Sequence, residues 1–234
     1  MDNEISDDVL KGYMDGLATS TSTDLILGEP EGFTTQNQPK RATSVKTALT
    51  QGIPGATNYC GQAAAASVLT AWGKNGGKTA EQLLAEIYGR FPPDGLPDGG
   101  TSAGALQKIL QSYGLRSTYR TIPAWLPGGF MNPANQGIWH AYRMEIEGYL
   151  GRGWPIIVAV DTGMLPNRTN DAWWALHYVV YTAHNGGSVT LANAFNGSGQ
   201  YADVSMPTNK FHEAWELRMF PTGYPKFWAI VPYE

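Results

Sequence analysis

The central part of the chain carries apolar residues in the pattern of buried helices. Residues 60–72 contain four consecutive alanines followed by three large apolar side chains, and the run stops at a glycine, which predicts a buried helix. Residues 79–88 predict a second helix, because they begin with a threonine cap and have Glu and Gln in the first turn. A third helix is predicted to open at Thr101 or Ser102 and to stop at Gly114.

The pattern then changes from helices to strands. Residues 143–150 still look helical, and the turn Gly186-Gly187 predicts a hairpin. Short apolar runs predict strands over residues 154–160, 176–183, 189–194 and 227–231, the last of which could close the sheet. Helices followed by strands favour an α+β protein, with a helical lobe packed against an antiparallel sheet lobe.

The first 44 residues differ in composition from the rest. They are rich in Ser, Thr, Asp, Asn and Gln and include the tract Thr-Ser-Thr-Ser-Thr at residues 19–23. This composition predicts an N-terminal arm over residues 1–44, either flexible or a prosegment, followed by one domain over residues 45–234. The chain opens without a basic-then-apolar secretion signal. The expected location is therefore the cytoplasm or, for a mature secreted form, outside it.

The charge and composition of the chain argue against some classes of binding partner. The net charge is -4 and no run of five basic residues occurs, so neither nucleic acid nor an anionic membrane is an expected partner. Apolar runs such as residues 156–160 have the length of a strand and are too short to span a bilayer. The chain has one cysteine, which excludes an internal disulfide and a multi-cysteine metal site. The sequence implies no metal or organic cofactor, and it leaves the oligomeric state open.

That cysteine, Cys60, is the first candidate for chemistry. It is predicted to lie in the first turn of its helix, where the partial positive charge of the helix end stabilises a thiolate and lowers the thiol pKa. Gly61 leaves room beside it for a substrate carbonyl. The alternative is a small buried hydrophobic residue, which is the usual role of a lone cysteine. Such a residue would be expected in the middle of the apolar stripe, so the position favours a nucleophile.

A cysteine nucleophile needs a base, and the chain has four histidines. His177 stands at the start of a predicted strand, from which side chains can project into a cleft. His140 lies in a poorly patterned segment, His184 is expected to be solvated beside the hairpin turn, and His212 is expected on a surface helix with two glutamates. His177 is therefore the predicted base, and a hydrogen-bonded core histidine is the alternative.

The hairpin supplies a third residue, Asn193. Pairing across Gly186-Gly187 places residues in the low 190s opposite the late 170s and low 180s. A side-chain oxygen of Asn193 can then accept the proton on the second ring nitrogen of His177 and fix the orientation of the ring. A turn asparagine is the alternative, because Asn196-Gly197 follows closely.

Together these segments resemble a known family. The run Tyr-Cys-Gly-Gln-Ala-Ala at residues 59–64 resembles the nucleophile helix of the C39-like branch of papain-like cysteine peptidases. Residues 153–158, then residues 177–180 and the Gly-Gly hairpin, are similar to the sheet lobe of that family in the same order. The resemblance covers about residues 45–200 and implies a papain-like fold, with Gln51 as the side-chain donor to the oxyanion.

The sequence departs from the family pattern at three places. The family usually has proline where Gln62 stands. Its orienting residue is commonly an aspartate followed by proline, whereas Asn193 is followed by Ala194. The step from Gln51 to Cys60 is longer than in papain.

The expected function is a cysteine peptidase or amidase that cleaves a peptide or protein substrate through an acyl-thioenzyme. Cys60 would be the nucleophile, His177 the base and Asn193 the orienting residue, with Gln51 at the oxyanion. One alternative is acyl transfer, or cleavage of a non-peptide amide, by the same residues. The other is a papain-like domain that binds peptides or a partner protein without turnover.

Overall fold

The structure, a computed structural model, describes seven stretches of the chain, residues 39–43, 59–93, 100–122, 133–166, 176–195, 201–217 and 226–234. The helices in these stretches are α3 (Cys60–Ala71), α4 (Ala80–Arg90), α5 (Ala103–Ser112), α6 (Pro133–Gly151), the short 3₁₀ helix η1 (Thr162–Met164) and α7 (Thr208–Trp215). The strands are β1 (Arg116–Ile122), β2 (Ile156–Asp161), β3 (Leu176–His184), β4 (Ser188–Phe195), β5 (Tyr201–Pro207) and β6 (Lys226–Tyr233).

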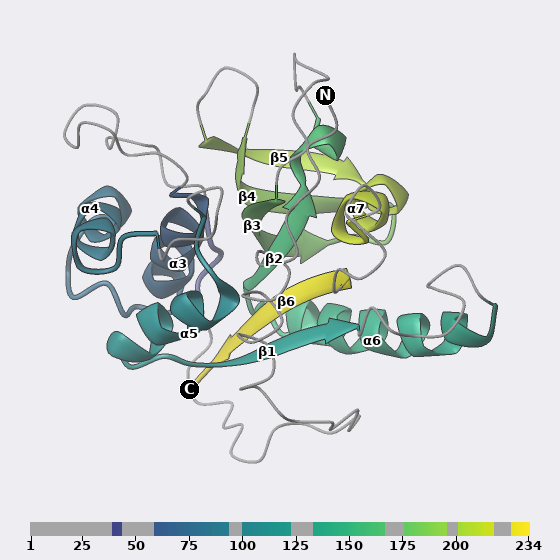
Figure 1. Cartoon of the computed structure of the whole chain (residues 1–234), viewed down its shortest axis with the longest axis horizontal. Coiled ribbons are helices and arrows are strands. Elements are labelled where there is room, and N and C mark those ends of the chain that lie inside the picture. The colour runs from purple at the N-terminus through teal and green to yellow at the C-terminus, as the bar shows by residue number, and fades with distance from the viewer. Residues whose placement is uncertain are drawn as a thin grey trace, which may run out of the picture.

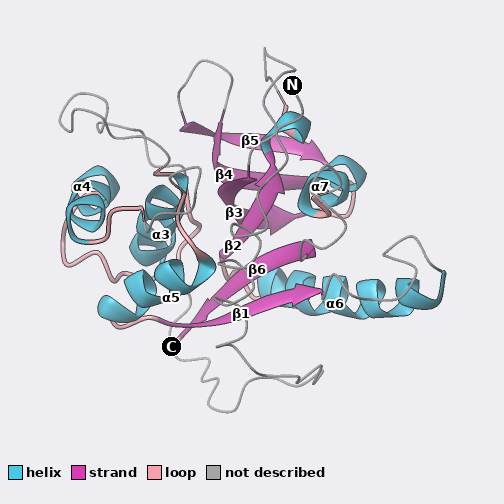
Figure 2. Ribbon diagram, in the orientation of Figure 1, coloured by secondary structure: helices cyan, strands magenta, loops and turns pink. Residues whose placement is uncertain are grey.

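The strands form an antiparallel sheet in the order β1-β6-β2-β3-β4-β5. Helices α3, α4 and α5 gather on the left of the sheet in Figure 1, and α7 lies to its right. Figure 2 shows the same separation of helices from strands. The predicted α+β architecture, with a helical lobe packed against an antiparallel sheet lobe, is confirmed.

In the helical lobe, α4 and α5 begin where the capping residues in the sequence predict. Thr79 caps α4 through a capping box with Gln82. Ser102 caps α5 by accepting a hydrogen bond from the backbone N–H of Ala105 at 3.1 Å. Because these bonds satisfy N–H groups that the helix itself leaves without acceptors, they fix where each helix begins.

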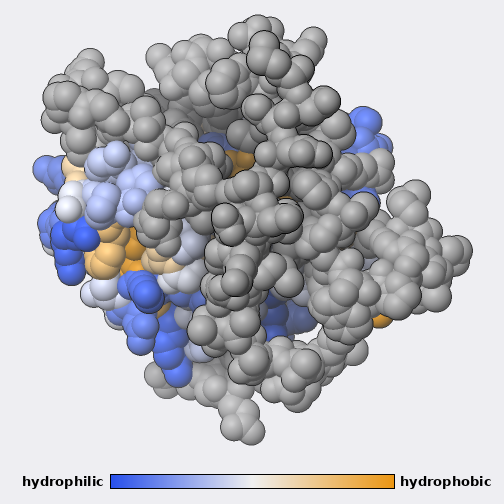
Figure 3. Space-filling model, viewed as in Figure 1, coloured by the Kyte–Doolittle hydropathy of each residue, from blue (hydrophilic) through white to orange (hydrophobic). Residues whose placement is uncertain are grey.

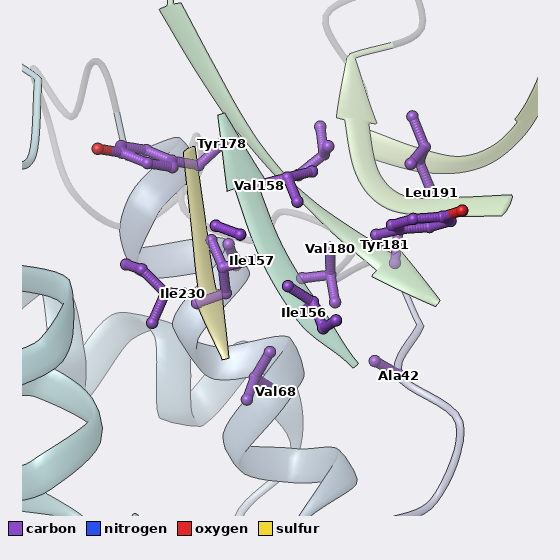
Figure 4. Close-up of a cluster of buried hydrophobic side chains, with 14 of the residues drawn as sticks. Ala42, Val68, Ile156, Ile157, Val158, Tyr178, Val180, Tyr181, Leu191 and Ile230 are labelled. Carbon is purple, nitrogen blue, oxygen red and sulfur yellow. The ribbon is translucent and has the colours of Figure 1, made fainter. Parts of the chain in front are cut away.

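Helix α3 is buried along almost its whole length. Its four alanines have no exposed surface, and the helix contacts α4, α5 and strands β2, β3 and β4. Figure 4 shows Val68 of α3 in the same core cluster as Ile157 and Ile230, which are cross-strand partners in β2 and β6. Small side chains therefore let the helix that begins at Cys60 approach the sheet closely.

Residues 39–43, which the sequence places in the arm, pack against α3. The N–H of Lys40 donates to the carbonyl of Ala71 at 2.7 Å, and the Ser67 hydroxyl donates to the carbonyl of Thr43 at 2.6 Å. Ala42 is 2% exposed and belongs to the core. This short stretch is therefore part of the packed domain, whereas residues 1–38 and 44–58 lie outside the described residues.

Two strands and most of one helix were not predicted. β1 and β5 are the outer strands of the sheet, and their sequences mix polar with apolar residues, so neither shows a continuous apolar run. In β5 the buried residues Val204 and Met206 alternate with more exposed neighbours. β6, expected to close the sheet, lies inside it between β1 and β2.

Helix α6 begins ten residues before the predicted start, at Pro133 rather than residue 143. Proline is favoured in the first turn of a helix, where its missing N–H costs no hydrogen bond. The buried side chains of α6 follow helical spacing, Trp139, Tyr142, Ile146 and Tyr149. Glycines and polar residues between them hide this stripe in the sequence.

Polar contacts join α4 to the end of α5 on the surface. Glu86 of α4 accepts a hydrogen bond from the Tyr113 hydroxyl at 2.9 Å and pairs with Lys78 at 3.1 Å and Arg90 at 3.3 Å. On the left of Figure 3, hydrophilic residues surround a smaller hydrophobic patch. Exposed pairs of this kind contribute little to stability, and the core holds the lobe together.

Candidate active site

Cys60 is the first residue of α3 and is half-buried. The preceding residue, Tyr59, is buried, and its ring packs edge-on against Tyr88 of α4 with centroids 6.5 Å apart. The N–H of Ala63 donates to the Tyr59 carbonyl at 2.9 Å, which marks the first turn of the helix. The predicted position of Cys60 in a helical first turn is confirmed, and the partial positive charge of that end favours a thiolate.

Gly61 packs tightly against the start of α5. A Cβ atom at this position would lie 3.0 Å from Cβ of Thr101 and 3.1 Å from Cδ2 of Leu106. The sequence interpretation assigned Gly61 to substrate access. The structure gives a different reason for the glycine, which is the close approach of α3 to the start of α5.

Gln62 is completely buried, although its side chain is polar. Its Nε2 donates to the carbonyl of Phe91 at 3.0 Å, and its Oε1 accepts a hydrogen bond from the Thr101 hydroxyl at 3.1 Å. A proline could make neither hydrogen bond. Gln62 therefore makes two specific hydrogen bonds at the position where the family that the sequence resembles usually has proline.

His177 is the second residue of β3 and is 5% exposed. Its backbone pairs with Val160 of β2 in the middle of the sheet. Because α3 contacts β3 directly, the helix that carries Cys60 and the strand that carries His177 are packed neighbours. The predicted location of His177 at the start of a strand is confirmed, and its role as base stays a prediction.

Asn193 lies in β4, the return strand of the hairpin. The register pairs Ala192 with Val180 and Leu191 with Tyr181, as the turn at Gly186-Gly187 predicts. The pairing of β4 with β5 is irregular between Leu191 and Ala194, which includes Asn193. Gln51, the predicted oxyanion donor, lies outside the described residues. The roles of both residues stay predictions.

Two other histidines meet at a single carboxylate. His184 Nδ1 at the end of β3 and His212 Nε2 on α7 lie 3.9 Å and 3.8 Å from Glu147 Oε1 on α6. Arg143 Nε lies 3.7 Å from the same oxygen. The side chains of His184 and His212 are 19% and 18% exposed, so neither is as open to solvent as its sequence context suggests. These contacts join three elements of the sheet lobe.

The pKa of Glu147 reflects this environment. Burial raises it, but the neighbouring His212, His184 and Arg143 outweigh burial, so the pKa lies below its ordinary value of 4.5. When folding lowers the pKa of a carboxyl group, the ionised group stabilises the fold at pH values above its pKa in the unfolded chain. That contribution is lost as the pH falls through the folded pKa.

Glu147→Gln should therefore destabilise the protein in a pH-dependent way. We expect the free energy of unfolding to fall by about 1 kcal/mol at pH 6, and the difference from wild type to vanish near pH 3. Urea unfolding at several pH values measures this. Glu213→Gln is the control, because Glu213 pairs with the exposed Lys210 and should have a smaller effect. An equal loss at pH 3 and pH 6 for Glu147→Gln would contradict the ionic role.

The part of the chain that the structure describes contains no group of three or more His, Cys, Asp or Glu side chains placed to hold a metal ion. Within the same ranges, none of the helices has the length and apolar character needed to cross a membrane.

Comparison with known proteins gives matches among solved structures. No protein-family model and no curated protein matches the sequence. The chain is similar to a double glycine motif protease from an AMS/PCAT transporter, solved in complex with the leader peptide, at 18% identity over 85% of this chain and 99% of that chain, with a TM-score of 0.44.

Two further structures belong to the same functional class. The peptidase domain of Streptococcus ComA, a bifunctional ABC transporter, is 15% identical over 83% of this chain and 97% of that chain, with a TM-score of 0.44. A C39-like peptidase candidate from Bacillus anthracis is 16% identical over 82% of this chain and 98% of that chain, with a TM-score of 0.48.

Proposed function

We propose that the protein is a cysteine peptidase or amidase that cleaves a peptide or amide bond through an acyl-thioenzyme. The observation that supports this most is the position of Cys60. It is half-buried in the first turn of a buried helix, and that helix packs against β3, the strand that carries His177 as its second residue. A helix N-terminus next to an imidazole is the environment in which a thiol becomes a reactive thiolate.

In the proposed reaction the Cys60 sulfur attacks the carbonyl carbon of the substrate. The negative charge that develops on the carbonyl oxygen is stabilised by the backbone N–H of Cys60 and the side-chain amide of Gln51. His177 donates its proton to the leaving amine as the C–N bond breaks, which leaves an acyl-thioenzyme. Water then attacks, His177 takes its proton, and the C–S bond breaks to release the acid.

Asn193 acts through His177 in this scheme. Its side-chain oxygen accepts the N–H of the second ring nitrogen, which selects the tautomer whose other nitrogen faces the sulfur. The register supports this role at the level of the backbone, because Asn193 follows Ala192, the partner of Val180 on the strand that carries His177. We expect the sulfur and a ring nitrogen of His177 to lie roughly 3 to 4 Å apart in the unliganded enzyme.

Mass spectrometry of a peptide library incubated with the protein tests this function. We expect cleaved peptides with wild type, a covalent adduct on Cys60 after treatment with a thiol-directed electrophile, and neither product with Cys60→Ala. Products in which an added amine replaces water would favour acyl transfer instead. Bound but uncut peptides, together with an unreactive Cys60, would contradict catalysis and favour a binding domain.

A further inference from the structure

The helix that carries Cys60 begins differently from its two neighbours. α4 and α5 are capped by the side chains of Thr79 and Ser102, which accept hydrogen bonds from backbone N–H groups of the first turn. α3 has Tyr59 at the N-cap, and this residue makes no side-chain capping bond. A side-chain cap would occupy N–H groups at the helix end, where a thiolate or an oxyanion would bind. Because α3 has no such side-chain cap, other contacts are needed to fix its first turn.

The side chain of Gln62 links the first turn of α3 to the two neighbouring helices. It lies two residues after Cys60, and its side chain joins three elements through the two hydrogen bonds to Phe91 and Thr101. Phe91 is the C-cap residue of α4, and Thr101 directly precedes Ser102, the N-cap residue of α5. One amide side chain therefore ties the start of α3 to the end of α4 and to the start of α5.

Both partners of the side-chain pair are removed from water. Gln62 has no exposed surface and Thr101 is 1% exposed, so water cannot replace the hydrogen bond between them. Packing at Gly61 adds a second constraint, because even a Cβ atom at this position would lie only 3.0 Å from Cβ of Thr101. The bond and the contact together favour a single arrangement of residues 60–62.

We propose that Gln62 and Thr101 are positioning residues for Cys60, which fix the first turn of α3 through contacts at its side and so orient the residue that attacks the substrate. This inference rests on the proposed function of Cys60. Neither residue touches the substrate in this scheme. Their effect is to aim the N–H groups of the first turn, which determine how well the thiolate is stabilised.

Thr101→Val tests the inference, because it keeps the shape of the side chain and removes the hydroxyl that donates to Gln62. The rate constant for alkylation of folded protein by iodoacetamide, measured from pH 4 to pH 9, reports the thiolate directly. We expect the thiol pKa in Thr101→Val to rise by about one unit, which lowers the rate about tenfold at pH values well below the wild-type thiol pKa. Thr101→Ser keeps the hydroxyl and should stay within about twofold of wild type.

Thr182→Val is the matched control. It removes a hydroxyl that donates to the carbonyl of Thr190 at 3.0 Å in the β3–β4 hairpin, and it should leave the alkylation profile unchanged. Gln62→Met keeps the length of the side chain and loses both hydrogen bonds, so it repeats the test if Thr101→Val does not fold. Folded Thr101→Val and Gln62→Met proteins with the wild-type profile would overturn the inference. A wild-type Cys60 that alkylates as an ordinary thiol would instead overturn the proposed function itself.

Discussion

Replacing Cys60 or His177 with alanine is expected to lower kcat/KM for a cleaved peptide by about three orders of magnitude or more. In the proposed mechanism, Cys60→Ala removes the atom that bonds to the substrate, and His177→Ala removes the group that gives the leaving amine its proton. Steady-state rates with a peptide found by library screening measure both effects. His140→Ala is a matched control, because His140 is exposed on α6 and should be dispensable.

Asn193→Ala should show a smaller loss than either of these variants, because in the proposed mechanism the residue orients the base and does not react. A variant that retained full activity would move the orienting role to another residue. Asn196, which lies outside the described residues, and Asp203 of β5 are the next candidates. Loss of activity in His140→Ala equal to that in His177→Ala would contradict the assignment of the base.

Trp215→Ala should produce the largest loss of stability. Trp215 of α7 is fully buried, and its Nε1–H donates to the carbonyl of Trp228 in β6 at 2.8 Å. Its ring stacks on Phe211 at 5.4 Å and meets Trp139 of α6 at 5.8 Å. Removing an aromatic side chain from such a cluster costs about 3 to 5 kcal/mol, a large part of the roughly 5 to 15 kcal/mol that stabilises a typical domain.

Urea unfolding of Trp215→Ala, with Trp215→Phe as the control, measures this effect. The phenylalanine variant keeps most of the packing and loses the hydrogen bond, so its loss should be closer to about 1 to 2 kcal/mol. A loss below about 1 kcal/mol in Trp215→Ala would show that α7 does not hold the sheet lobe together as the aromatic contacts indicate.

Much of the architecture could be predicted because its signals are local. The alanine run of α3, the Thr79 cap of α4 and the glycine turn between β3 and β4 each depend on neighbouring residues. β1 and β5 were missed because outer strands need apolar residues on fewer positions, and their polar residues interrupt the pattern. The meeting of His184 and His212 at Glu147 depends on tertiary packing, which local pattern does not reveal.

In the candidate site, too, features with local signals were predictable, and contacts between distant residues were not. The positions of Cys60 at a helix start and His177 at a strand start were predictable from periodicity. The bond between Gln62 and Thr101 joins residues 39 positions apart, so spacing gave no sign of it. For the same reason the close packing of Gly61 against Thr101 gave no signal in the sequence, and the role of Gly61 in substrate access stays a prediction.

The measurement that tests the central claim most directly is the alkylation of Cys60 in folded wild-type protein at about pH 6. Because the chain has one cysteine, mass spectrometry reports this site without ambiguity. A catalytic Cys60 should be modified rapidly, because in the proposed site a helix N-terminus and the His177 imidazolium would hold it as a thiolate well below the ordinary thiol pKa of about 8.5. The rate should fall in His177→Ala. Labelling that requires denaturant and does not depend on His177 would contradict the account and leave Cys60 as a residue of the core.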